Sequence, residues 1–245
     1  MHIPDGYLGP ATSGFFYAVM LPIWTIASRM VKKTLKAKQV PMLAVGAAFS
    51  FVIMMFNVPI LGGSTGHAVG GVLVAILLGP WAACIAITVA LVIQALLFGD
   101  GGITALGANC FNMAFIMPFT GYYIYKALSY HASPNSNRQV IAAGIAGYIG
   151  LNVAALLTGI EFGLQPLLHH TATGQALYCP YGLNVTVPAM VGEHLLIFGW
   201  VEATVTALVI KFLQKQDING FPPKTRGNDN VGLDSGMTAK NGENL

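Results

Sequence analysis

The sequence predicts an all-α membrane protein, a bundle of about seven transmembrane helices. Hydrophobic residues make up 55% of the 245 positions, and charged residues only 9%, against roughly 25% in an ordinary soluble domain. The mean hydropathy is +0.65, and apolar runs recur along most of the chain. A soluble protein needs a charged surface, so this composition excludes a nucleic-acid binder, a disordered chain and a secreted disulfide scaffold.

Seven apolar runs are expected to form the membrane spans, because a bilayer-spanning helix needs about 20 mostly apolar residues. They are 12–31, 40–59, 67–79, 81–98, 104–125, 139–160 and 188–212. The third run is short and glycine-rich, and Gly79-Pro80-Trp81 joins it to the fourth. Residues 67–98 therefore form either one long kinked helix or two helices joined by a tight turn.

The distribution of basic residues favours two helices there. Lys and Arg collect on cytoplasmic loops, and here they cluster between the first two spans, around the 126–138 loop and after the last span. If 67–98 crosses twice, all three clusters fall on one side of the membrane. The sequence then predicts seven passes in the cell inner (plasma) membrane, with the N-terminus outside and the C-terminus in the cytoplasm.

The chain divides into one transmembrane domain, 1–215, and a polar tail, 216–245. The tail is rich in Asn and Gly and has no helical periodicity, so it is expected to be a flexible cytoplasmic end. The opening MHIPDGYLGP has no Lys or Arg before the first apolar run, unlike a cleavable signal peptide. Met1 is therefore expected to stay in the mature protein.

The second residue is a histidine, and this position offers three nitrogen donors to one metal ion. They are the α-amine of Met1, the backbone amide nitrogen of His2 and the His2 imidazole. Amine and amide close a five-membered chelate ring, and amide and imidazole close a six-membered ring, so the donors lie near one plane. A neutral imidazole from elsewhere would complete a square-planar site. The alternative is a histidine that stands there by chance.

His67 is the candidate for the fourth nitrogen. The predicted topology places it on the same face of the membrane as Met1 and His2, and it follows the glycine-rich stretch 62–66, where another backbone can approach closely. Square-planar nitrogen coordination suits Ni(II) and Cu(II), whereas Zn(II) prefers tetrahedral ligands and Mg(II) prefers oxygen.

Four segments resemble the CbiM/NikM family, the substrate-binding S components of nickel and cobalt importers of the energy-coupling-factor type. They are MHIPDGYLGP at the start, NVPILGGSTGHAVGG at 57–71, GDGGITALGANCFNMAF at 99–115 and GEHLLIFGWVEATVTALVI at 192–210. The resemblance covers 1–212. Its specific part is the MHIPDG opening followed by a GxxxGH segment.

The resemblance implies capture of one divalent metal from outside, with Ni(II) as substrate and Co(II) possible. The implied ligands are the Met1 amine, the His2 amide and imidazole nitrogens, and the His67 imidazole. The implied partners are a transmembrane coupling subunit, a pair of cytoplasmic ATPases and a small accessory membrane subunit, all at the lipid bilayer. The chain itself would not be an enzyme, and it contains no GxxxxGK[ST] motif. Planar nitrogen geometry favours nickel over cobalt.

Four further residues are candidates for the surroundings of the metal ligands. Asp5 lies in an expected Asp-Gly turn and can accept a hydrogen bond behind a ligand. Ser64 lies in the loop before His67, and Asn109 and Asn112 lie near the outer end of the fifth span. The two asparagines are expected to bond to the N-terminal segment or to the loop before His67, and the alternative is hydrogen bonding to neighbouring helices.

Two other functions compete with metal capture for an importer. A self-sufficient secondary transporter usually places acidic groups at mid-membrane, and only Glu202 is a candidate. An intramembrane enzyme is disfavoured because the chain has neither HExxH nor GxSxG. The roles of Glu202, His194, His169 and His170 stay open at this stage, with helix packing favoured for His194 and polar surface for the His169-His170 pair.

Overall fold

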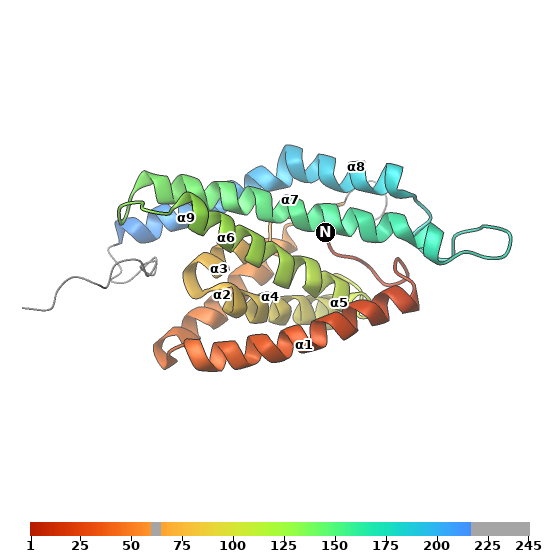
Figure 1. Cartoon of the computed structure of the whole chain (residues 1–245), viewed down its shortest axis with the longest axis horizontal. Helices are drawn as coiled ribbons and strands as arrows, with labels where there is room; N and C mark the ends of the chain where they lie inside the picture. The colour runs from red at the N-terminus through yellow and green to blue at the C-terminus, as the bar shows by residue number, and fades with distance from the viewer. Residues whose placement is uncertain (60–64, 217–245) are drawn as a thin grey trace, which may run out of the picture.

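The protein is an all-α bundle, as predicted, in a computed structural model that describes residues 1–59 and 65–216 (Figure 1). Its α-helices are α1 (Pro10–Thr34), α2 (Val40–Met55), α3 (Gly71–Leu78), α4 (Pro80–Ile93), α5 (Leu106–Asn109), α6 (Met117–Leu128), α7 (Asn137–Leu168), α8 (Leu183–Glu193) and α9 (Gly199–Lys215). The minor elements are a 3₁₀ turn, Ala37–Gln39, and an antiparallel pair of two-residue strands, β1 (Val58–Pro59) and β2 (Thr65–Gly66). Each predicted apolar run contains a helix.

Three π-helical segments continue regular helices at the centre of the bundle. Gln94–Phe98 extends α4, Cys110–Ile116 joins α5 to α6, and His194–Phe198 joins α8 to α9. A π segment shifts the side chains that follow it around the helix axis and is frequent at functional sites. Gln94, the first residue of one π segment, and His194, the first of another, are fully buried.

Four helical stretches are long and apolar enough to cross a membrane among the described residues: Pro10–Thr34, Pro80–Phe98, Asn137–Leu168 and Leu183–Lys215. Val40–Met55 is a shorter apolar helix. Many large hydrophobic side chains point outward, among them Phe15, Val45 and Leu196, as lipid-facing residues do. The count of seven crossings and their orientation stay predictions.

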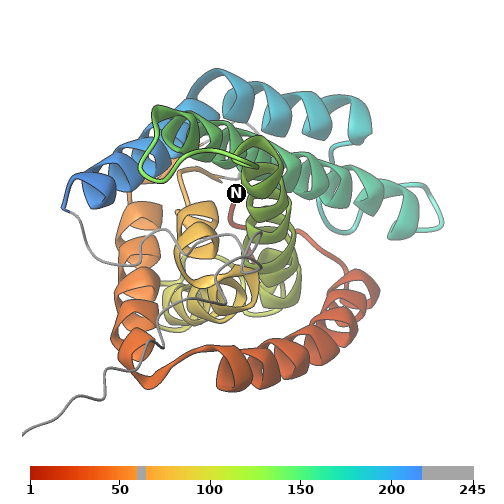
Figure 2. The same cartoon turned by 60° about the vertical axis from the view of Figure 1, so that its left-hand side comes forward.

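The N-terminus lies inside the bundle, which neither composition nor periodicity predicts. Figures 1 and 2 show it between the α7 layer and the helices below it. Met1 and Ile3 are fully buried members of the hydrophobic core. The chain then leaves the interior and enters α1, whose first residue, Pro10, has no N–H to leave unsatisfied.

Residues 67–98 form two helices rather than one kinked helix. α3 ends at Leu78, and Gly79 adopts φ 90° and ψ 157°, a conformation that favours glycine. Pro80 then begins α4, which packs against α3. α3 has eight residues and is therefore about 12 Å long, too short to cross a bilayer by itself.

Two predicted boundaries were wrong. The second run ends at Met55 rather than at 59, because Pro59 restricts Val58 to an extended backbone and both residues pair with β2. The stretch 161–187, which lies between the last two predicted spans, is helical over much of its length, since α7 continues to Leu168 and α8 begins at Leu183. The expected tail begins at 216, and all of it except Gln216 lies outside the described residues.

We expect the close approach of α1 and α5 to depend on Gly107. A Cβ on this residue would lie 2.8 Å from the backbone nitrogen of Tyr17 and 3.0 Å from the carbonyl carbon of Phe16. Since these backbone atoms cannot move without displacing α1, Gly107→Ala should destabilise the protein by roughly 1–3 kcal/mol. Gly14→Ala is the control, because an added Cβ there meets nothing within 4 Å. Thermal unfolding in detergent measures both, and equal melting temperatures would contradict this packing.

Candidate metal-binding site

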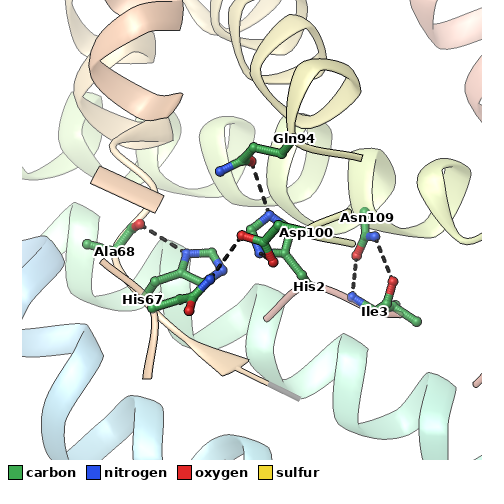
Figure 3. A network of polar contacts seen from close by, with 8 residues as sticks. His2, Ile3, His67, Ala68, Gln94, Asp100 and Asn109 are labelled. Carbon is green, nitrogen blue, oxygen red and sulfur yellow. Dashed lines mark hydrogen bonds and ion pairs between the residues drawn. The ribbon is translucent and has the colours of Figure 1, made fainter. Parts of the chain in front are cut away.

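The first residues of the chain cross the middle of the bundle and bring His2 to His67 (Figure 3). Met1 is 0% exposed, His2 3% and His67 1%. The His2 and His67 rings are stacked, with centroids 4.5 Å apart and an angle of 26° between their planes. The structure therefore places the three predicted ligand residues in one buried region.

Ile3 fixes the N-terminal segment through its backbone. Its N–H donates to Oδ1 of Asn109 at 2.8 Å, and its carbonyl oxygen accepts from Nδ2 of Asn109 at 3.1 Å (Figure 3). The same carbonyl accepts the N–H of Gly102 at 2.8 Å. The Asn109 amide thus binds both the N–H and the C=O of Ile3. These buried backbone groups would otherwise lack partners, because the segment lies in no helix or sheet.

Asp5 holds the segment where it leaves the interior. Its carboxylate accepts the backbone N–H of Ile103 at 3.2 Å and that of Thr104 at 2.8 Å, as well as the Thr104 hydroxyl. A Cβ on Gly102 would lie 2.4 Å from the Asp5 backbone nitrogen, so only glycine permits this approach. Asp5 therefore acts on the N-terminal segment through the 99–105 loop.

His2 contacts an amide on one side and a carboxylate on the other. Its Nε2 lies 3.2 Å from Oε1 of Gln94. The Gln94 carbonyl oxygen and the Asp100 carboxylate are both acceptors, and a neutral imidazole has one N–H, so His2 can donate to only one of them. Nδ1 is the nitrogen that closes a six-membered ring with the His2 amide. It lies 3.3 Å from Oδ1 of Asp100, and Asn57 donates to the other carboxylate oxygen at 2.9 Å.

His67 is oriented in a similar way. Its Nδ1 lies 3.1 Å from the carbonyl oxygen of Ala68 (Figure 3), so Nδ1 carries the proton and Nε2 keeps the lone pair. Among residues 1–59 and 65–216, Nε2 has no hydrogen-bond partner. A ring N–H donated to a carbonyl is the usual orientation of a metal-binding imidazole.

Burial favours the neutral forms of the Met1 amine and the His2 imidazole. Desolvation lowers the pKa of the Met1 amine to about 4, although the nearby carboxylates of Asp100 and Glu193 oppose this shift. Desolvation also lowers the pKa of the His2 imidazole to about 3, with the N-terminal charge as the second cause. Neutral amines and imidazoles are the forms that bind metals, and the two carboxylates offer negative charge beside them.

The other predicted residues lie at different places. Asn112 donates to Thr158 at 3.1 Å and to Glu161 at 2.9 Å, so its amide group binds α7 rather than the N-terminal segment. Ser64 lies outside the described residues. His169 faces Thr12 at 3.3 Å near the start of α1, and His170 is exposed.

Two residues with open roles lie beside this region. Glu202 is buried in α9 and accepts the backbone N–H groups of Val69 and Gly70. Buried His194 donates from Nδ1 to the carbonyl oxygen of Met190 at 2.7 Å. In the described part of the chain, no cluster of three or more His, Cys, Asp or Glu side chains is arranged to hold a metal.

Sequence reasoning missed Gln94, Asp100 and Asn57 as neighbours of His2. The signal for Gln94 was available, because it is an amide within the otherwise apolar run 89–98, and a polar side chain in a span usually has a specific partner. Asp100 and Asn57 lie in connections that no periodicity brings together. Only the tertiary fold identifies them.

Comparison with known proteins agrees with this fold. The chain is 53% identical over 231 residues to the probable fused nickel transport protein LarMN of Lactiplantibacillus plantarum, covering 93% of this chain and 69% of that protein. It is 51% identical to the fused nickel transport protein NikMN of Rhodobacter capsulatus, covering 91% of this chain and 65% of that protein. The chain thus spans about two thirds of the length of these fused relatives.

A crystal structure described as a truncated transition metal transporter superposes with a TM-score of 0.84 at 57% identity, covering 88% of this chain and 99% of that chain. Fold and similarity together define a multi-pass membrane protein of the metal-transport class. The family described as CbiM, cobalt uptake substrate-specific transmembrane region, matches residues 2–219. The chain belongs to the CbiM family.

We expect Asn109→Ala to release the N-terminal segment. The variant removes two buried hydrogen bonds to Ile3, worth roughly 1 kcal/mol each, so the Ile3 amide should exchange with deuterium about tenfold faster or more. Asn152→Ala is the control, because the hydrogen bond of the Asn152 amide stays within α7. Hydrogen exchange read by mass spectrometry compares them, and unchanged exchange over residues 1–8 in Asn109→Ala would exclude this anchoring.

Proposed function

We propose that this chain is the substrate-binding membrane subunit of an ATP-driven nickel importer, with cobalt as the alternative substrate. It captures one divalent ion from outside and passes it inward together with partner subunits. The observation that carries the proposal is the burial of the Met1 amine in the same region as His2 and His67. A free α-amine is costly to bury, and binding a cation is a function that repays this cost.

The proposed ligands are four nitrogens: the Met1 amine, the amide and Nδ1 of His2, and Nε2 of His67. Ni(II) displaces the amide proton and accepts a planar set of nitrogens. The His2 and His67 ring centroids lie 4.5 Å apart, close enough for both imidazoles to reach one ion. Asp100 is then placed to balance part of the charge of the ion.

Nickel is the preferred substrate of the two. Planar nitrogen ligation favours it on chemical grounds, and the relatives at 53% and 51% identity are named nickel transport proteins. The family description names cobalt uptake, which keeps Co(II) as the second substrate. Ligand geometry and similarity therefore support the same order of preference.

The proposed partners are a transmembrane coupling subunit, two cytoplasmic ATPases and a small accessory membrane subunit. The chain has no phosphate-binding GxxxxGK[ST] motif, so energy from ATP must come from another polypeptide. The names of the fused relatives and their greater length support a second membrane component. In the proposed orientation the N-terminus faces outward and the C-terminus faces the cytoplasm.

A self-sufficient secondary transporter is less well supported. Its candidate ion-binding group in the sequence is Glu202, yet this carboxylate is fully buried and engaged by the backbone N–H groups of Val69 and Gly70. A carboxylate occupied in this way is not free to bind a transported ion. The relatives are named transport proteins rather than enzymes.

An extension of several residues before Met1 should abolish tight nickel binding. The addition converts the amine into an amide, which is a poorer ligand, and Met1 has no exposed surface to accommodate a longer chain. Calorimetric titration of Ni(II) into purified protein measures the effect, with a C-terminal extension as the control. Unchanged affinity in the N-terminally extended protein would exclude the amine as a ligand.

His67→Ala should also lose tight binding but keep a weaker site. The amine, amide and imidazole of the first two residues remain, so nickel should bind more weakly by at least about tenfold, as loss of one ligand implies. His131→Ala, in an exposed loop, is the matched control. Equal affinities of His67→Ala and the unmodified protein would overturn the proposed ligand set.

A further inference from the structure

The carboxylate of Glu202 binds the segment that immediately follows His67. Oε2 accepts the N–H of Val69 at 2.8 Å, and both carboxylate oxygens lie within 3.1 Å of the Gly70 nitrogen. Glu202 is 0% exposed and lies more than 130 positions away in the sequence. This contact therefore ties α9 to the chain that carries a proposed ligand.

The physical reason for this contact is the start of α3. Gly70 is the N-cap residue of α3 and Val69 precedes it, so neither N–H has a partner within the helix, and negative charge is favourable at that end. Hydrogen bonds to a carboxylate are stronger than those to a neutral acceptor. Gly147 of α7 permits close packing against α9, since a Cβ there would lie 3.1 Å from Oγ1 of Thr206 and 3.3 Å from the carbonyl oxygen of Glu202.

The π segment His194–Phe198, which leads into α9, covers the residue that precedes His67. A Cβ on Gly66 would lie 1.9 Å from the Phe198 ring, so the ring is packed directly on the Gly66 backbone. The His194 ring packs in turn on Phe198, with centroids 5.4 Å apart. Phe198 and Glu202 are four residues apart, which places them on one face of a helix. This face holds the His67 segment on both sides.

We infer that Glu202 and Phe198 are positioning residues that hold the His67 imidazole in place for the metal. The inference rests on the proposed function and adds to it a route for release. α9 runs on to Lys215 at the proposed cytoplasmic end, where partner subunits would act. A shift of α9 would move Val69 and Gly70 with Glu202, withdraw His67 and open the fourth coordination position.

Glu202→Gln tests the inference with little change in shape. The substitution removes the charge and turns a donor group toward two backbone donors. Nickel affinity should fall about tenfold or more, as it does when the support of a ligand is removed. The visible absorption spectrum of the nickel complex should shift toward that of His67→Ala. Thr206→Val is the control on the same helix, since the Thr206 hydroxyl has no hydrogen-bond partner among the residues that the structure describes.

The deciding measurement is a double-mutant cycle. If Glu202 acts only through His67, Glu202→Gln should cause no further loss of nickel affinity in the His67→Ala background. An equal loss in both backgrounds would overturn the inference, as would an unchanged affinity of the single variant. These results leave the proposed function standing if His67→Ala alone weakens binding. Retained affinity in His67→Ala would instead reject the function.

A second variant covers the case in which Glu202→Gln does not fold, as judged by its melting temperature. Phe198→Leu keeps an apolar side chain but uncovers Gly66. In the same cycle it should weaken nickel binding when His67 is present and have no effect when His67 is absent. A loss that is independent of His67 would again overturn the inference.

Discussion

The arrangement of this protein depends on burial of its first three residues. A free amine and a peptide that belongs to no helix or sheet are unfavourable in an apolar interior. Asn109 and Gly102 compensate for this cost by binding both polar groups of Ile3. Asp5 holds the segment at the exit. Without these contacts the Met1 amine would return to water and the two histidines would not meet.

The surrounding helices are irregular where they face this segment. α3 is too short to cross the bilayer, α4 ends in a π segment, and π segments join α5 to α6 and α8 to α9. Gln94 and His194 begin two of these segments, and Asn109 immediately precedes the third. The bundle thus departs from regular geometry where polar groups must point inward. α9 then adds a contact from a distant part of the chain by binding the residues after His67.

Much of this was predictable from the sequence. Apolar runs and their glycine and proline boundaries predicted the helices, and the distribution of basic residues predicted the division between α3 and α4. The position of His2 predicted a chelate, and topology placed His67 on its side. The partners of Gln94 and Glu202 could not be predicted, because they depend on the rotation of each helix, and Asp100 lies in a connection that no periodicity places. The length of α7 was also missed, because the polar residues Glu161 and Gln165 are typical of a loop. In the structure they are buried in the helix and accept hydrogen bonds from Asn112 and from the Gly9 N–H, respectively.

A crystal of the nickel-loaded protein, measured at the nickel absorption edge, tests the central claim most directly. The account predicts one anomalous peak in the plane of four nitrogens, within bonding distance of the Met1 amine, the His2 amide, Nδ1 of His2 and the His67 imidazole. A peak bound by other residues, or a Met1 nitrogen beyond bonding distance of the ion, would contradict it.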